Sequence, residues 1–122
     1  MIVIEFTVPG RVDTHHRPRA SIRGGKVHTR KAASYRAYID RVAWLARSPF
    51  AGWPLDLRYA VTLTVHEHDR RSRDLDNACK GVLDGLKGAA WNDDRQVDDL
   101  RVVRGEVRKT APCVVVKVEV LP

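Results

Sequence analysis

The side chains of this sequence best suited to chemistry are five aspartates that fall between residues 74 and 94. They are Asp74, Asp76, Asp84, Asp93 and Asp94, in a chain whose formal net charge is +7. Carboxylates that a fold brings together repel one another, so each must be protonated, separated or bridged by a cation. Hard oxygen ligands in this number suit Mg²⁺ or Mn²⁺. The stretch therefore predicts a site for a divalent metal ion.

A helix is expected to carry the first three of these aspartates. Apolar residues recur there with the period of a helix that packs one stripe against a core; they are Leu75, Cys79, Val82, Leu83 and Leu86. Asp76, Lys80 and Asp84 are four residues apart, which predicts one exposed face. Asp74 and Asp76 stand at the helix entry, where unpaired N–H groups and the helix dipole favour negative charge. An N-cap followed by a solvated acidic turn is the alternative interpretation of that entry.

The residues after this helix predict a return of the chain. Lys87-Gly88 ends the helical pattern, and Trp91-Asn92-Asp93-Asp94 predicts a turn that would bring the second acidic pair beside the first. This turn is preceded by Asp74-Leu75-Asp76-Asn77, Lys80 and Asp84 and followed by Arg95-Gln96-Val97. With these residues, the stretch resembles the RusA family of Holliday-junction resolvases. The shared pattern, D-x-D-N-x-x-K-x-x-x-D-x-L followed by W-x-D-D-x-Q-V, is specific. The general layout of the chain agrees with that family over most of its length.

The resemblance implies a crossover junction endodeoxyribonuclease of DNA recombination and repair, which resolves four-way junctions by paired symmetric nicks. RusA-like enzymes act as homodimers with one site per subunit, and a two-fold dimer matches the symmetry of such a junction. A nuclease of the same fold that acts on other branched DNA is one alternative. A catalytically silent nucleic-acid-binding module, in which the acidic cluster is structural, is another.

The resemblance also assigns roles within the acidic stretch. The implied catalytic residues are Asp74, Asp76, Lys80 and Asp94. The three aspartates would hold Mg²⁺, with Mn²⁺ as a substitute, so that the ion activates water and stabilises charge on the phosphorane and the departing oxygen. Asp93 is either a further ligand or an orienting group. Lys80 would donate to the scissile phosphate or the leaving oxygen, or hold a carboxylate in place; a salt bridge within the helix is the alternative.

The rest of the charge is unevenly distributed along the chain. Residues 11–47 hold ten Lys or Arg against two Asp, a net of +8, whereas residues 84–99 hold two against five, a net of −3. A basic body with a local acidic cluster suits a protein that binds a polyanion and needs a cation site. The alternative is a solvated basic surface. The expected DNA contacts are Arg17, Arg19, Lys26, Arg70, Arg71 and Arg73.

The segment from Arg11 to His28 predicts a flexible basic arm that grips phosphates. It contains Arg17-Pro18-Arg19, which is comparable to the basic segment that RusA-like proteins carry after their first strand. Residues 20–23 and 26–28 flank Gly24-Gly25 and predict a short hairpin. A mobile surface loop is the alternative.

The remaining patterns predict an α+β fold in one domain that spans residues 1–122. Four strands are expected in a mixed or antiparallel sheet, grouped in hairpins rather than in repeated βαβ units; they are 2–8, 55–65, 97–107 and 113–121. Besides the acidic helix, a second helix is expected from about Thr29 to about Arg47. Trp44 on this helix is expected in the core, with a partner surface as the alternative. The apolar candidates for a dimer interface are Trp44, Trp53 and Tyr38.

Several classes of protein are disfavoured by the sequence. Cys79 and Cys113 lack C-x-x-C spacing and are interpreted as buried thiols of a cytoplasmic protein rather than a disulfide or zinc site. His66 and His68, two residues apart, suggest at most a weak soft-metal site, because no third ligand is suitably spaced. The chain shows no apolar run of about 18 residues, no signal peptide and no nucleotide-binding loop, which predicts neither a membrane span nor a nucleotide cofactor.

Overall fold

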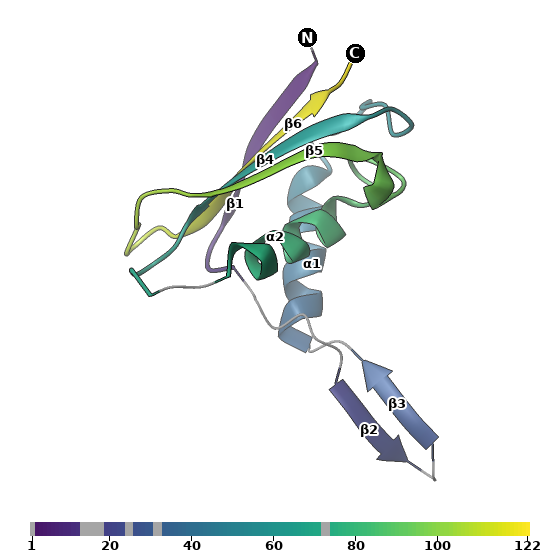
Figure 1. Cartoon of the computed structure of the whole chain (residues 1–122), viewed down its shortest axis with the longest axis vertical. Helices are drawn as coiled ribbons and strands as arrows, with labels where there is room; N and C mark the ends of the chain where they lie inside the picture. Colours follow the sequence, from purple (N-terminus) through teal and green to yellow (C-terminus); the bar gives the residue numbers. More distant parts are fainter. Residues whose placement is uncertain (1, 13–18, 24–25, 31–32, 72–73) are drawn as a thin grey trace.

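The computed structural model describes residues 2–12, 19–23, 26–30, 33–71 and 74–122, with segments 19–23 and 26–30 described by their backbone (Figure 1). The strands are β1 (Val3–Pro9), β2 (Arg19–Arg23), β3 (Lys26–Arg30), β4 (Tyr59–His66), β5 (Val97–Arg104) and β6 (Cys113–Val120). The helices are α1 (Ala33–Ala46), α2 (Leu75–Leu86) and the 3₁₀ helix η1 (Asp94–Gln96). Of the expected DNA contacts, Arg17 and Arg73 lie outside the described residues, as do the side chains of Arg19 and Lys26.

The sheet is mixed, which confirms the predicted α+β fold. Its four strands follow the order β1-β6-β4-β5, and β6 pairs antiparallel with both β1 and β4. β5 pairs parallel with β4, so α2 is the crossover of a β4-α2-β5 unit. The predicted grouping of the strands in hairpins is therefore wrong at this point. Parallel neighbours need a connection that returns the chain along the full length of the first strand.

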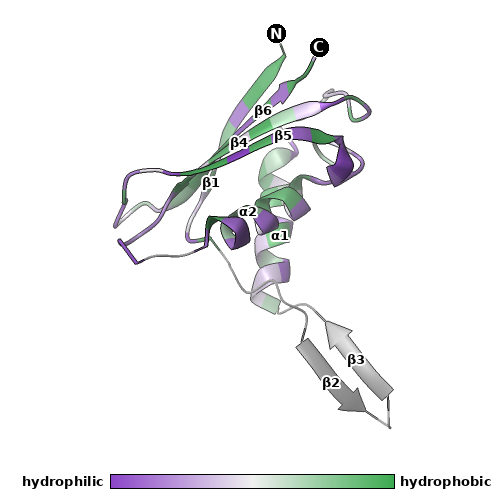
Figure 2. Cartoon of the chain, viewed as in Figure 1, coloured by the Kyte–Doolittle hydropathy of each residue, from purple (hydrophilic) through white to green (hydrophobic). Residues whose placement is uncertain are grey.

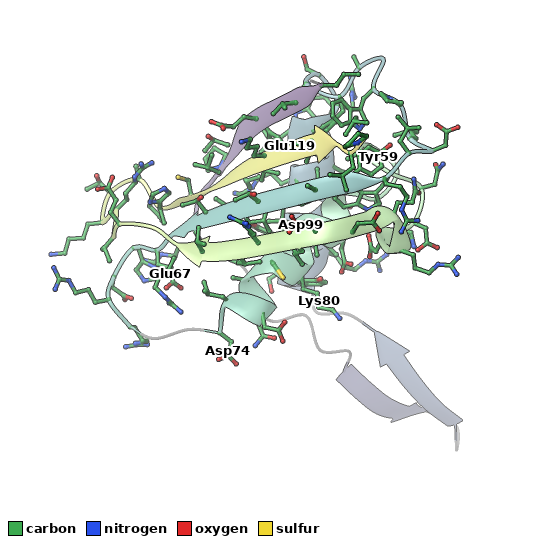
Figure 3. The ribbon with its side chains drawn as sticks, turned by 45° about the horizontal axis from the view of Figure 1, so that its top comes forward. Tyr59, Glu67, Asp74, Lys80, Asp99 and Glu119 are labelled. Carbon is green, nitrogen blue, oxygen red and sulfur yellow. The ribbon has the colours of Figure 1, made fainter. Side chains whose placement is uncertain are left out.

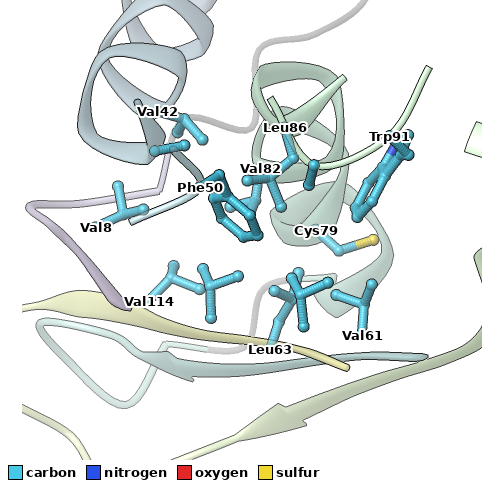
Figure 4. Packing of buried hydrophobic residues seen from close by; sticks show 14 of the residues in the cluster. Val8, Val42, Phe50, Val61, Leu63, Cys79, Val82, Leu86, Trp91 and Val114 are labelled. Carbon is cyan, nitrogen blue, oxygen red and sulfur yellow. The ribbon is translucent and has the colours of Figure 1, made fainter. Parts of the chain in front are cut away.

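Both helices cover the same face of the sheet and enclose the core (Figures 1 and 4). The alternation along β4 buries Tyr59, Val61, Leu63 and Val65 almost completely. They pack against buried residues of α2, among them Val82 and Leu86. Figure 2 shows hydrophilic residues in the loop between β4 and α2 and hydrophobic residues along the strands beneath the helices. No helix in the described part of the chain is long and apolar enough to cross a membrane.

Three boundaries differ from the predictions. Residues 26–30 pair with 19–23 as the predicted hairpin, so α1 begins at Ala33 rather than near Thr29. β4 begins at Tyr59, because the Tyr59 hydroxyl donates to the Pro54 carbonyl and holds the preceding residues in a loop. β5 ends at Arg104, three residues before the predicted end.

Trp44 is not in the core. Its side chain is 64% exposed, whereas the buried stripe of α1 runs through Tyr35, Tyr38, Val42 and Ala46. Two residues beyond Val42, Trp44 is turned to the opposite side of the helix, since successive residues advance by about 100°. The prediction was wrong because it weighed the type of residue above its position.

Two glycines allow α1 and α2 to approach closely. A Cβ at Gly81 would lie 2.8 Å from Cδ2 of Tyr38, and a Cβ at Gly85 would lie 2.5 Å from Cβ of Val42. Both glycines are buried and one turn apart on α2. The face of α2 that carries them therefore has no room for a side chain.

We expect Gly85→Ala to lower the free energy of unfolding. Replacing a helical glycine by alanine usually gains up to about 1 kcal/mol, but overpacking costs about 1–3 kcal/mol. Val42 is β-branched and has one strongly preferred rotamer in a helix, so it cannot move aside. Urea denaturation measures the change, with Ser34→Ala on the exposed side of α1 as the control. A stabilised Gly85→Ala variant would contradict the close helix contact.

Candidate active site

The loop that leads from β4 to the acidic helix is fixed at its start by a partly buried ion pair. Oε2 of Glu67, whose side chain is 8% exposed, lies 2.9 Å from Nη1 of Arg104 on β5. The Arg108 N–H donates to the Glu67 carbonyl at 2.8 Å. Nδ1 of His66 lies 2.9 Å from the Glu106 carbonyl oxygen. Sequence reasoning did not single out Glu67 or Arg104, because nothing in the local pattern marks them as partners.

Asp74 and Asp76 lie at the start of α2 with exposed side chains. Asp74 occupies the N-cap position in an extended conformation, with φ −68° and ψ 118°. Its carboxylate nevertheless makes no capping hydrogen bond to the first turn of this helix. Asp74 therefore occupies the N-cap position of the alternative interpretation, but its carboxylate oxygens do not cap the helix.

Cys79 lies one turn inside the helix and is a buried thiol, as the sequence predicts. Its Sγ donates to the Asp76 carbonyl oxygen at 3.1 Å. Burial, and after it the charge of Asp76, raises the pKa of this thiol. The group is therefore protonated at neutral pH and is not available as a thiolate ligand. Cys113 is also buried and free, so the two cysteines form no disulfide.

The three residues expected on one exposed face of α2 do not share an environment. Asp76 and Lys80 are exposed, as predicted. Asp84 is only partly exposed and accepts a short hydrogen bond from the Tyr35 hydroxyl of α1. Asp84 therefore ties the two helices together, and the exposed polar face ends before it.

The second acidic pair is carried by a turn whose central residue is Trp91. This side chain is fully buried, and its ring centroid lies 6.0 Å from that of Tyr59 at the start of β4. Its indole N–H donates to Oδ1 of Asp94 at 2.8 Å. An exposed carboxylate is thus oriented by a donor that is itself fixed in the core.

Asp93 has a different role, because both of its oxygens are used within the turn. Oδ1 accepts from the Arg95 backbone N–H at 2.9 Å, and Oδ2 lies 3.4 Å from Nη2 of Arg95. The hydrogen bond from the Arg95 N–H, and after it the one from the guanidinium, lowers the pKa of Asp93. Oε1 of Gln96 accepts from the Asp93 N–H at 2.9 Å, which completes a capping box at η1. Asp93 is therefore a structural cap.

Gln96 connects this turn to the loop before β4. Its Nε2 donates to the carbonyl oxygens of Leu55 and Leu57, both at 2.8 Å. The glutamine of the sequence pattern thus holds the turn in place from both sides. Its role as a link between two distant segments was not predicted, because the pattern contains only local spacing.

Within one chain, the two acidic groups lie at opposite ends of α2. Asp74 precedes the helix and lies at the end of β4. Just after the helix, the backbone of Lys87 forms an isolated β-bridge with Trp91, whose ring lies beside Tyr59 at the start of β4. A helix of 12 residues is about 18 Å long at about 1.5 Å per residue. Figure 3 shows Asp74 and Glu67 at one end of the sheet and Tyr59 at the other.

The predicted convergence of the aspartates is therefore not formed inside a single chain. Among the described residues, no group of three His, Cys, Asp or Glu side chains is placed to hold a metal ion. This includes all five aspartates of the acidic stretch, and also His66 and His68. One chain supplies Asp74 and Asp76 at one end and Asp94 at the other.

Basic residues occur in the loop before α2 and, apart from it, in the β2–β3 hairpin. Arg70 and Arg71 are exposed, and the Arg71 N–H donates to Oδ1 of Asp69 at 3.0 Å. In the β2–β3 hairpin, Arg19 stands opposite Arg30 and Arg23 opposite Lys26. The hairpin projects away from the sheet and helices in Figures 1 and 3.

Known proteins are similar to this chain over most of its length. A family model described as endodeoxyribonuclease RusA matches residues 9–119. The crossover junction endodeoxyribonuclease RusA of Escherichia coli strain K12 is 38% identical over 86 residues, which cover 70% of each chain. The protein of that name from Enterobacteria phage 82 gives the same identity and coverage. The uncharacterized protein YqaN of Bacillus subtilis is 32% identical over 123 residues, which cover 84% of this chain and 87% of that one. These matches show that the chain belongs to the RusA family of endodeoxyribonucleases, which hydrolyse phosphodiester bonds in DNA.

Proposed function

We propose that this protein resolves four-way DNA junctions by paired nicks, in DNA recombination and repair, and that a divalent metal ion, Mg²⁺ by preference, supports cleavage. The observation that carries the proposal is the state of the motif carboxylates. Asp74 is at the N-cap without making the capping bond, and Asp94 is exposed and oriented by a buried indole. The fold determines where these carboxylates stand and leaves oxygens of both exposed to a ligand.

The donor chemistry suits the ion. Asp74, Asp76 and Asp94 are exposed aspartates, and hard carboxylate oxygens are what Mg²⁺ binds in proteins. When bound, such an ion supplies an activated water and stabilises charge on the attacked phosphate. Trp91 holds Asp94 in one orientation, as hydrogen-bonded neighbours of metal ligands commonly do. Lys80, exposed one turn after Asp76, would contact the scissile phosphate.

Because the two acidic groups are separated within a chain, we propose that each site is shared between two copies. β5 is at one end of the sheet order, and its outer edge pairs with no strand of the described chain. Leu100, near its middle, is aligned with Val61 and is therefore on the helix side of the sheet, yet is 43% exposed. An open edge with exposed apolar residues is a template for another strand.

The charges of β5 favour a second copy of β5 as that strand. In an antiparallel pair centred on Leu100, Asp99 of each copy stands opposite Arg101 of the other. Asp99 and Arg101 are aligned with Ala60 and Thr62, so both occupy the sheet face away from the helices. Opposite charges directly across a pair of strands stabilise it, and a two-fold axis forms this pair twice.

This arrangement brings the separated acids to the same place. β5 begins beside Asp94 and ends at Arg104, which is bound to Glu67 in the loop that leads to Asp74. Antiparallel pairing sets the beginning of β5 in one copy beside its end in the other. The Asp94 of each copy is thereby directed toward the Asp74 and Asp76 of the other, and the homodimer has two sites for two nicks.

The hairpin supports binding of a polyanion. Its register places Arg19, Arg23, Lys26 and Arg30 at positions of one face, in two like-charged pairs. Like charges directly opposite one another destabilise a pair of strands. Phosphate groups would relieve this repulsion, and a backbone contact of this kind fits recognition of branch shape rather than base sequence.

We expect Asp74→Asn, Asp76→Asn and Asp94→Asn to bind a synthetic four-way junction as the unaltered protein does, but not to nick it in Mg²⁺. Each change keeps the shape of the side chain and removes the charge that the ion requires. Asp93→Asn should retain nicking, because Asp93 serves the turn. Denaturing gels of end-labelled junction and linear duplex, with and without Mg²⁺, measure the effect. Mg²⁺-dependent cutting that survives in two of the first three variants would exclude the assignment.

A shared site makes a sharper prediction for mixtures. An Asp76→Asn chain and an Asp94→Asn chain are each inactive, but their mixed dimer has one intact site. If half of the dimers are mixed and each has one of two sites, nicking should return to about a quarter of the normal rate. If each site lies within one chain, mixing restores nothing, which would refute the shared site.

The interface in that prediction can be checked by charge exchange. Asp99→Lys should weaken the dimer in sedimentation equilibrium, and adding Arg101→Asp to the same chain should restore it. Glu5→Lys makes the same charge change on β1, at the other edge of the sheet, and serves as the control. If the double variant remains as weak as the single one, β5 does not pair in this register.

Arg17→Ala combined with Arg19→Ala should weaken junction binding and reduce its dependence on salt. Each phosphate contact that is lost removes about one counterion from the slope of log affinity against log salt. Fluorescence anisotropy at several KCl concentrations measures this slope. The single-site control is Lys109→Ala, an exposed charge in the loop between β5 and β6. An unchanged slope in the double variant would show that the arm does not contact phosphates.

A further inference from the structure

A cavity of about 610 Å³ lies beside α1, and Asp74, Asp76 and Asp94 do not line it. The lining residues that matter below are Asp40, Trp44 and Arg47 of α1, Phe50 and Trp53 of the following loop, and Lys87 just after α2. Its volume lies within the range of about 300–1,000 Å³ that is typical of ligand pockets.

The two tryptophans of this cavity differ in exposure: Trp53 is buried and fixed by contacts, whereas Trp44 is exposed. Trp53 is 8% exposed, donates its indole N–H to the Ala90 carbonyl at 3.0 Å, and packs edge to face on Phe50 with ring centroids 5.2 Å apart. Trp44 is 64% exposed, and the Arg47 guanidinium lies 4.4 Å from its ring centroid. The core does not require an indole at position 44. A planar ligand would find one aromatic face there.

The charges at the mouth favour an anionic ligand. Arg47 and Lys87 stand against Asp40, which gives the rim a net charge of +1. The backbone of Lys87 forms an isolated β-bridge with Trp91, and the Gly88 N–H donates to the Trp91 carbonyl at 2.7 Å. Trp91 is the residue whose indole N–H donates to Asp94. The rim of the cavity is therefore continuous with the turn that carries the second acidic group.

We propose that this cavity receives an unstacked base of the DNA strand that is being cut, with the base against Trp44 and the adjoining phosphates at Arg47 and Lys87. The inference rests on the proposed function, since that function places DNA beside Asp94. Four-way junctions and other branched DNA offer bases at the branch point that lack full stacking, and aromatic side chains bind such bases without regard to sequence. The cavity would thus distinguish branched from linear DNA.

The test compares Trp44→Ala, Trp44→Phe and the unaltered protein in Mg²⁺-free buffer, so that binding is measured without cutting. The probes are a four-way junction with 2-aminopurine at the branch point, a linear duplex and a single-stranded decanucleotide. Trp44→Ala should lose about tenfold in affinity for the junction and the single strand, and none for the duplex. Trp44→Phe should keep most of the affinity, and the 2-aminopurine signal should change only in proteins with an aromatic residue at position 44.

Controls separate this proposal from its rivals. Val107→Ala shortens another exposed apolar side chain, which is 41% exposed, and should change no affinity. Equal binding of the junction and the single strand by Trp44→Ala and the unaltered protein would overturn the proposal. So would a loss of dimer mass in Trp44→Ala, which would assign the cavity to a second copy. The single-strand measurement does not depend on junction cutting, so failure of the proposed function would be seen separately, as an unaltered protein that does not nick junctions.

Discussion

The parallel pairing of β4 with β5 is the constraint on which the rest of the structure depends. A strand cannot be followed by a parallel neighbour unless the chain first returns to the end where it started. Here α2 makes that return, so whatever precedes α2 lies at one end of the sheet and whatever follows it lies at the other. The two halves of the acidic motif are separated by this geometry, although they are close in sequence.

The fold treats the two halves differently. The first half is presented by a helix entry, whose loop is fixed by the partly buried pair of Glu67 and Arg104. The second half is presented by a turn that uses Asp93 and Gln96 for its own hydrogen bonds and Trp91 to orient Asp94. Neighbouring carboxylates in the motif thus divide the work: one keeps the turn in shape, and the other remains exposed.

The helices and strands could be predicted from the sequence better than the direction in which the strands pair and the distances between the site residues. The alternation of β4 and the apolar stripe of α2 are both present, since each follows from local periodicity. The direction of β5 could not be predicted, because alternation is the same in parallel and antiparallel strands. The proposed ligands could be named from the resemblance to the RusA family, but their separation within the chain depends on the direction of β5. The distinction between Asp93 and Asp94 depends on Gln96 and Trp91, whose contacts the spacing does not contain.

Gly81 and Gly85, which admit α1 against α2, also bear on the order of folding. Two glycines in 12 residues weaken the intrinsic tendency to form this helix, and short helices are marginal in water in any case. The helix that carries Asp76 and Lys80 is therefore expected to become ordered only when α1 docks on it. A nascent or partly unfolded chain would then hold its acidic residues on a fluctuating segment, unable to cut DNA before the domain is complete.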